Sequence, residues 1–296
     1  MIYILDSVLE EIKESIGNHL PERGGALLGE PDKPIITKFI FDSNAFTTSS
    51  SYCPSRKLNK KVKEVEEKEG LEFKGIIHSH PHQYDEPSSQ DIVELATGLR
   101  LNKHMPFYLA PIVTITEPED LEAHELAIDT MKVSFYAGFP SEEFDVTLRK
   151  MEVRKIPEAQ LTKDIEVLCE KKEGFLHPEV FIIAGESEPM LTGKIEVEDQ
   201  FELLFLVELK YPNCQPRMLL TYVNGNQEEL NPQWDSEISF IEMLDKFITE
   251  KIKSNSTTSK HIQIKIAGKN MEKIHRSKMG YKLRLSKENK FVLEEK

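Results

Sequence analysis

Two histidines and one aspartate in the first third of the chain have the residue types and the spacing of a metal site. His78 and His80 stand two residues apart at the end of an apolar stretch, so in a β-strand both side chains leave on the same face. Asp91 lies at the start of a predicted helix and can supply a third, anionic ligand. Two nitrogens and one carboxylate oxygen leave a fourth tetrahedral position open, as in catalytic zinc sites. The pattern therefore predicts one Zn²⁺ ion per chain.

Each part of this pattern also has an ordinary structural explanation. A His-x-His sequence is common by chance, and surface histidines are usually only solvated. The sequence from Ser88 to Asp91 is equally a capping box, in which Ser88 caps a helix and Asp91 returns its carboxylate to the cap backbone. The combination favours the metal site, because a buried strand ends in His-Ser-His-Pro and seven residues, 81–87, separate the second histidine from Ser88.

Glu22 is the candidate for proton transfer. It precedes Gly24 and Gly25, where the backbone can approach another segment closely. A carboxylate placed near a metal site can accept a proton from water and return it to a leaving amine. The alternative is a plain surface carboxylate, but the position beside the glycines favours catalysis.

The elements that must hold these residues are strands and helices in mixed order. Val8, Ile12 and Ile16 recur at helical spacing, with Ser7 as a possible cap. Further helices are predicted over 58–68 and 88–101, and strands over 2–5, 35–41, 73–77, 112–115 and 132–136. The segment 24–29 is predicted to be a tight turn that leads into a buried strand. This order predicts an α/β domain, a mixed sheet flanked by helices, over residues 1–150, with 139–156 as a charged connector.

The second half has a different pattern and is predicted to be an α+β domain over residues 151–296. A helix over 158–173 leads into four short strands that indicate an antiparallel meander, over 180–184, 191–197, 201–209 and 217–223. A helix over 238–252 follows, and then a polar loop over 253–260. The chain ends in strands predicted over 262–266, 281–285 and 290–293.

Composition narrows the class of protein. The 296 residues are 39% hydrophobic and 30% charged, as in soluble globular proteins, and the net charge of -13 argues against a nucleic-acid binder. Three scattered cysteines indicate a reducing compartment. Asp6 interrupts the first apolar residues, and no apolar run is long enough to cross a bilayer. We therefore expect a cytoplasmic protein without a nucleic-acid or membrane partner.

The site residues resemble the signature of a known family. His78-Ser79-His80, seven residues, and Ser88-Ser89-Gln90-Asp91 are similar to the motif of the JAMM (MPN-plus) metalloproteases of the prokaryotic JAB type. The segment 21–29 is similar to that family's catalytic-glutamate segment, and Tyr52-Cys53-Pro54 falls where the family tends to have Tyr-x-Pro before a helix. The resemblance covers roughly residues 1–140.

The resemblance implies a role for each residue. His78, His80 and Asp91 would bind zinc, Glu22 would act as general base and acid, and Ser88 would help to stabilise the oxyanion. Zinc lowers the pKa of a bound water to about 7. The resemblance also implies a substrate, because many members hydrolyse the amide that joins ubiquitin or a ubiquitin-like protein to a lysine. An extended tail could add to a sheet edge beside the zinc, with 81–87 and the strand near Ile112 as walls of the groove.

The second domain is similar to ubiquitin-conjugating folds. The similarity rests on Tyr211-Pro212 with Pro216 after the meander and on Asn231-Pro232-Gln233-Trp234 before a helix. No cysteine follows Cys214, so we expect the second domain to be a non-catalytic relative of these folds. Such a domain would bind activating or conjugating enzymes of a ubiquitin-like system. An unrelated α+β domain with Trp234 in its core is the alternative.

Three functions follow as hypotheses. The first is a zinc isopeptidase or peptidase, deubiquitinase-like, that cleaves after the tail of a ubiquitin-like protein, in deconjugation or precursor processing. The second is a binding or scaffold module of a ubiquitin-like conjugation system. The third is a metallopeptidase that acts on another small protein, such as a sulfur carrier.

Overall fold

The chain forms two compact units in the computed structural model, Met1–Ile156 and Pro157–Lys296. The structure describes residues 1–17, 21–48, 51–81, 84–115, 120–141, 145–170, 176–184, 188–197, 200–212, 217–230, 238–259, 281–285 and 291–295. The division falls after 156 and not after 150, because β13 (Val153–Ile156) pairs with β1 (Ile2–Leu5) in the sheet of the first unit.

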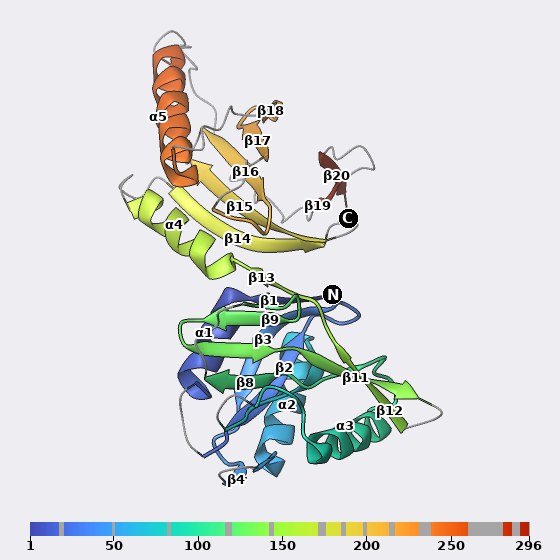
Figure 1. Cartoon of the computed structure of the whole chain (residues 1–296). Coiled ribbons are helices and arrows are strands. Elements are labelled where there is room, and N and C mark those ends of the chain that lie inside the picture. Colours follow the sequence, from blue (N-terminus) through green and yellow to red (C-terminus); the bar gives the residue numbers. More distant parts are fainter. Residues whose placement is uncertain are drawn as a thin grey trace. The chain divides into compact units, whose positions relative to one another are not determined.

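The first unit is built on one mixed sheet of eleven strands (Figure 1). Besides β1 and β13, its strands are β2 (Gly24–Gly29), β3 (Ile35–Phe41), β6 (Glu72–Ser79), β7 (Tyr108–Leu109), β8 (Ile112–Ile115), β9 (Glu125–Ile128), β10 (Met131–Ser134), β11 (Tyr136–Ser141) and β12 (Asp145–Lys150). The main order is β12-β11-β7-β6-β2-β3-β1-β13. β6 is central: it runs antiparallel to β2 and parallel to β7 and β8. The predicted mixed sheet with flanking helices is confirmed.

Helices cover both faces of this sheet. Alternate residues of β2 point to opposite faces. Leu27 packs in the cluster that contains Val8, Leu9 and Ile12 of α1 (Asp6–Ser15), whereas Ala26 and Leu28 pack with Leu58 and Val62 of α2 (Arg56–Glu69). A third cluster lies at the β12 end of the sheet, where Leu95 and Leu99 of α3 (Ser89–Leu101) pack on Val146. The strands that carry the candidate site are therefore held in a sheet that is packed on both faces.

The helix boundaries follow local capping. Ser55 accepts a hydrogen bond from the N–H of Leu58 at 3.1 Å and begins α2, and Gly70 ends it with φ of 68°. The predicted cap of α1 is wrong, because that helix begins one residue before Ser7, and its N-cap Leu5 makes no side-chain cap. A short hairpin, β4 (Phe46–Thr48) and β5 (Ser51–Cys53), lies before α2.

The charged connector predicted over 139–156 is wrong. This segment contains the end of β11 and all of β12 and β13. β12 and β13 stand at the two ends of the main strand order. A terminal strand exposes one edge to water and tolerates charged side chains, which hide the strand pattern in the sequence.

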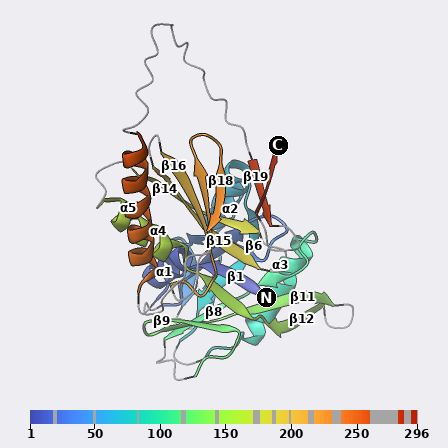
Figure 2. The same cartoon turned by 90° about the horizontal axis from the view of Figure 1, so that it is seen from above.

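The second unit contains the predicted antiparallel meander, which is confirmed. Its strands pair in sequence order: β14 (Leu176–Ala184), β15 (Pro189–Val197), β16 (Phe201–Val207), β17 (Arg217–Tyr222) and β18 (Gln227–Leu230). The sequence analysis missed β18, whose Gln-Glu-Glu-Leu sequence carries no apolar alternation. Two helices, α4 (Glu158–Glu170) and α5 (Phe240–Ser259), lie side by side and cover one face of this sheet (Figures 1 and 2).

The polar loop predicted over 253–260 is wrong over its described part, because α5 continues to Ser259. Serine, threonine and asparagine lower helix propensity by well under about 1 kcal/mol each, and no glycine or proline interrupts this run. A hairpin of β19 (Tyr281–Leu285) and β20 (Phe291–Glu295) follows. The strand predicted over 262–266, Cys214, Pro216 and the segment 231–234 lie outside the described residues.

No helix within the described part of the chain has both the length and the apolar character that a bilayer crossing requires.

Candidate metal centre

The three predicted ligands meet at the end of the central strand. His78 is the penultimate residue of β6, and His80 directly follows that strand. Asp91 lies in the first turn of α3. The backbone of the histidines is fixed by β8 and the residue before it: the N–H of His78 donates to the carbonyl of Pro111 at 3.3 Å, and that of His80 to the carbonyl of Val113 at 2.9 Å. Both imidazoles therefore project from backbone that is part of the sheet.

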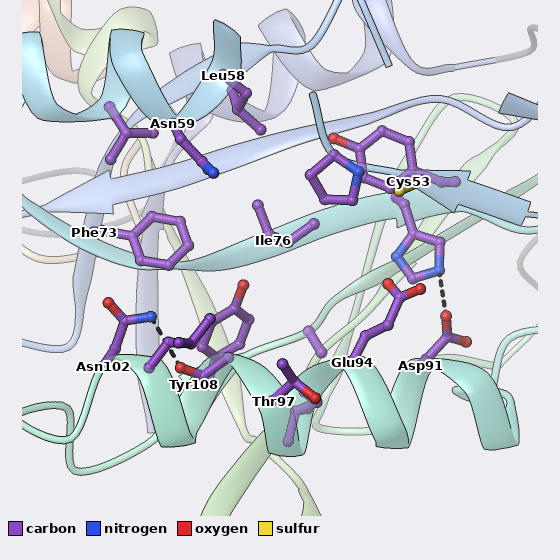
Figure 3. A pocket seen from close by; sticks show the side chains of 18 of the residues that line it. Cys53, Leu58, Asn59, Phe73, Ile76, Asp91, Glu94, Thr97, Asn102 and Tyr108 are labelled. Atoms are coloured by element: carbon purple, nitrogen blue, oxygen red, sulfur yellow. Dashed lines mark hydrogen bonds and ion pairs between the residues drawn. The ribbon is translucent and has the colours of Figure 1, made fainter. Parts of the chain in front are cut away.

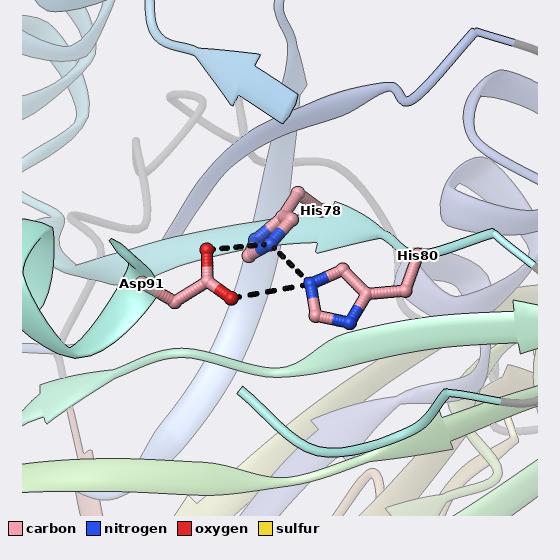
Figure 4. A group of neighbouring side chains, drawn as sticks. All are labelled: His78, His80 and Asp91. Atoms are coloured by element: carbon pink, nitrogen blue, oxygen red, sulfur yellow. Dashed lines mark hydrogen bonds and ion pairs between the residues drawn. The ribbon is translucent and has the colours of Figure 1, made fainter. Parts of the chain in front are cut away.

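The side chains converge on one point (Figure 4). The two Nε2 atoms lie 3.0 Å apart, and Nε2 of His78 and Nε2 of His80 each lie 3.2 Å from a different oxygen of Asp91. Ligands about 2.0–2.2 Å from a tetrahedral zinc ion are separated by about 3.3–3.5 Å. The donor atoms are thus close to the spacing that zinc requires, and the donor set of two imidazoles and one carboxylate fits a catalytic site.

The capping box and the ligand arrangement use the same residues. Oδ2 of Asp91 accepts a hydrogen bond from the N–H of Ser88 at 2.6 Å, and the N–H of Asp91 donates to Oγ of Ser88 at 3.3 Å. The carboxylate still faces both imidazoles. The predicted capping box is confirmed, and it is compatible with the predicted ligand role, because the capped carboxylate also faces the two histidines.

The electrostatics favour a charged Asp91. Burial opposes ionisation, but hydrogen bonds from His78, His80 and Ser88 outweigh it and hold the pKa of the Asp91 carboxyl far below its usual range. The pKa of His80 is also perturbed: burial lowers it, but the hydrogen bond to Asp91 and the nearby charges raise it overall. The site thus stabilises positive charge next to the Asp91 carboxylate.

His80 has a defined orientation. Its Nδ1 lies 3.1 Å from the carbonyl oxygen of Tyr84, and its ring stacks on the Tyr84 ring with centroids 5.8 Å apart. A carbonyl only accepts, so Nδ1 donates in this contact, and the ring is held with Nε2 turned toward Asp91. Such carbonyl partners orient metal-ligating histidines in many proteins.

Glu22 lies beside the histidines and is only 4% exposed. It lines a cavity of about 200 Å³ together with His80, Ser88 and Asp91. Burial is the main cause that raises the pKa of Glu22, and Asp91 adds to it, while His78 and His80 oppose it. A carboxylate that holds protons more tightly than usual suits a group that must accept and return one.

A reciprocal hydrogen-bond pair between Arg23 and Ser79 keeps Glu22 in this place. The N–H of Arg23 donates to Oγ of Ser79 at 3.0 Å, and the N–H of Ser79 donates to the carbonyl of Arg23 at 2.8 Å. At Gly24, a Cβ would lie 2.6 Å from the carbonyl oxygen of Ile77 and 2.7 Å from the ring of Tyr52. The absence of a side chain there allows the close packing that brings Glu22 next to the ligands. Sequence reasoning did not find the role of Ser79.

A groove of about 740 Å³ leads away from His78 and Asp91 (Figure 3). α2 and α3 form its sides, and Phe73 and Ile76 lie along its floor on β6. Sequence reasoning placed the walls at 81–87 and near Ile112; Ile112 itself is buried in the sheet, and Ala110, two residues before it, lines the groove. Pro81 and Tyr84 line the smaller cavity instead.

The groove-lining residues of α3 were missed, although their spacing was a signal. They recur three or four positions apart and so share one helix face. They are Asp91, Glu94, Leu95, Thr97, Gly98, Leu101 and Asn102.

Among the described side chains, two further histidines lie outside the ligand set. His104 lines the groove, and His124 is buried, with Nδ1 at 3.4 Å from Glu122. His82, for which we expected a loop position, and His19, His261 and His275 lie outside the described residues.

Comparison with known proteins covers the same part of the chain. Residues 6–126 match the family model of prokaryotic homologs of the JAB domain. No curated protein matches. Among solved structures, the chain is similar to a protein from Desulfitobacterium hafniense, with 20% identity and a TM-score of 0.37, over 53% of this chain and 94% of that one. It is also similar to a JAB1/MPN domain protein from Archaeoglobus fulgidus, with 16% identity and a TM-score of 0.27, over 52% of this chain and 96% of that one.

The residues that the family model matches include the three converging side chains and Glu22. The matched segment lies entirely within the first unit, so the similarity to prokaryotic JAB domains is a property of that unit.

Proposed function

We propose that this protein is a zinc-dependent peptidase or isopeptidase that cleaves after the C-terminal tail of a ubiquitin-like protein. One observation carries the proposal: the donor atoms of His78, His80 and Asp91 lie within 4.8 Å of one another, and Glu22 lines the adjoining cavity. A JAB/MPN protein without activity would be expected to lack at least one of these four groups, and none is missing.

The residues divide the chemistry between them. Zinc, held by the two imidazoles and Asp91, supplies Lewis acidity and lowers the pKa of a water molecule. Glu22 accepts a proton in the addition step and returns it to the leaving amine, since its raised pKa favours holding the proton between the two steps. Ser88 lines the same cavity, and its hydroxyl can donate to the oxyanion while Oγ accepts from the backbone N–H of Asp91.

The groove supports an extended protein segment as substrate. It begins at His78 and Asp91 and continues between α2 and α3, so a chain bound along it would present its end to the proposed metal. Leu58, Phe73 and Ile76 provide apolar contacts, while Glu94 places one carboxylate next to Asp91 (Figure 3). A flexible tail of a ubiquitin-like protein has the extended form that such a groove requires.

The first test is zinc binding. We expect Zn²⁺ to raise the unfolding temperature of the wild-type protein, because a ligand that binds only the folded state adds about 2.7 kcal/mol to the free energy of unfolding at a concentration 100 times its Kd. His78→Ala should lose most of this shift. His104→Ala removes a histidine from the same groove and should keep it. Equal shifts in all three proteins, measured by calorimetry, would count against the ligand assignment.

The second test concerns Glu22. Glu22→Gln keeps the size of the side chain but cannot accept the proton, so we expect cleavage of a fusion between a ubiquitin-like protein and a reporter to fall roughly 10²–10⁴-fold. The zinc-induced thermal shift should remain. The measurement is the rate of release of the reporter from a panel of candidate ubiquitin-like and sulfur-carrier fusions. If the variant cleaves as fast as the wild type, Glu22 is not the base.

The third test fills the groove. Thr97 is exposed on α3 and lines the groove, so Thr97→Trp should obstruct the substrate and raise KM by about tenfold, equivalent to about 1.4 kcal/mol of binding. The matched control is Val93→Trp, which adds the same ring to an exposed position of the same helix. Unchanged KM in Thr97→Trp, with the zinc shift intact, would show that the substrate does not use this groove.

We also propose that the second unit binds an activating or conjugating enzyme of a ubiquitin-like system. The order of helix, antiparallel strands and helix over residues 158–259 favours this candidate. We expect the full chain to capture such a purified enzyme in a pull-down, and a chain ending at Ile156 to lose that capture. Equal capture by both chains would place the contact in the first unit.

A further inference from the structure

A buried charge cluster outside the ligand set lies next to the segment that orients His80. Lys132 of β10 forms ion pairs with Asp85, one residue after Tyr84, and with Glu125 of β9 at 2.8 Å. The Lys132 side chain is 15% exposed and that of Glu125 is 6% exposed. Burying a lysine and a carboxylate costs free energy unless they are paired, so this arrangement needs an explanation.

Two residues of the cluster, Glu125 and Lys132, belong to strands of the sheet, whereas Asp85 does not. Glu125 accepts hydrogen bonds from the N–H of Glu122 at 2.9 Å and from the hydroxyl of Ser134 at 3.3 Å, so its carboxylate is held by the sheet. Lys132 stands opposite Thr114 of β8, and β8 pairs with the end of β6. The ammonium group is therefore anchored to the same sheet that carries His78. Asp85, by contrast, belongs to the connection between His80 and α3.

Asp85 can influence His80 through the peptide bond that joins Tyr84 to Asp85. The carbonyl of Tyr84, which contacts Nδ1 of His80, belongs to the peptide bond that joins Tyr84 to Asp85. Fixing the Asp85 carboxylate on Lys132 therefore limits rotation of that peptide. If the carbonyl turned away, Nδ1 would lose its acceptor and the ring could turn Nε2 away from Asp91.

We infer that Lys132 and Asp85 are positioning residues for the metal site: their ion pair holds the Tyr84 carbonyl on Nδ1 of His80 and so keeps Nε2 turned toward Asp91. This inference rests on the proposed zinc site, but it makes a statement about the metal-free protein as well. Neither residue lines the groove or the cavity beside Glu22. Their effect is on the orientation of a ligand.

The test compares two neighbouring acidic residues. Asp85→Ala breaks the contact with Lys132 and leaves the pair between Lys132 and Glu125 intact. Glu86→Ala removes the same charge from the next position, which is exposed, and so controls for the general electrostatic effect on a cation. Lys132→Met removes both ion pairs, and the double variant Asp85→Ala/Lys132→Met shows whether the two residues act through one contact.

The first readout is the ¹H–¹⁵N NMR spectrum of the imidazoles in metal-free protein. We expect a low-field signal, protected from exchange, for the proton that Nδ1 of His80 donates to Tyr84 in the wild type and in Glu86→Ala, and the loss of that signal in Asp85→Ala. The second readout is Zn²⁺ affinity from competition with a chelating dye. Asp85→Ala should bind about tenfold more weakly, as for other residues that orient metal ligands, and Glu86→Ala should stay within about twofold.

Two results would overturn the inference: a wild-type Nδ1 proton signal and affinity in Asp85→Ala, or equal weakening in Asp85→Ala and Glu86→Ala. The unfolding temperature of each variant separates a lost fold from a lost orientation. If the wild type binds no zinc, the proposed function fails, while the Nδ1 proton signal of His80 still decides the role of Asp85.

Discussion

The Asp91 carboxylate is the group on which the site depends. It is largely removed from water and ionised, which is costly unless hydrogen bonds and opposite charges surround it. Two imidazoles and the backbone N–H of Ser88 meet this need. A cation bound between the carboxylate and the imidazoles would meet it better, because it places a full positive charge where the protein alone offers hydrogen bonds. The position of β6, the start of α3 and the burial of Glu22 all serve this one arrangement.

Sequence reasoning worked where a local pattern determines a side chain's direction. The two-residue period of a strand was enough to place His78 and His80 on one face, and the capping sequence of Ser88 and Asp91 was enough to place the start of α3. The mixed sheet and the meander followed from the order of apolar stretches. In each case neighbours in the chain carry the information.

Sequence reasoning failed where a contact joins residues that are distant in sequence. It also failed where charged residues of an edge strand hide the apolar alternation of that strand. β12 and β13 carry many charges because they are terminal strands, and their sequence was therefore predicted to be a charged connector. Lys132 and Asp85 are 47 positions apart, and the reciprocal bonds of Arg23 and Ser79 join positions 56 apart. No sequence periodicity predicts such pairs, because they form only when the fold brings distant segments together. The sides of the groove were not predicted for the same reason, since they depend on how two helices pack on β6.

The shared use of Asp91 as helix cap and as ligand has a mechanical consequence. The carboxylate that would grip the ion also closes the first turn of α3, and the same helix presents Glu94 and Thr97 to the groove. Binding of the ion would therefore stiffen α3, along which the proposed tail would lie, several residues beyond the ion itself. Removing the ion would loosen that helix at the same end, so occupancy and grip on the tail would rise and fall together.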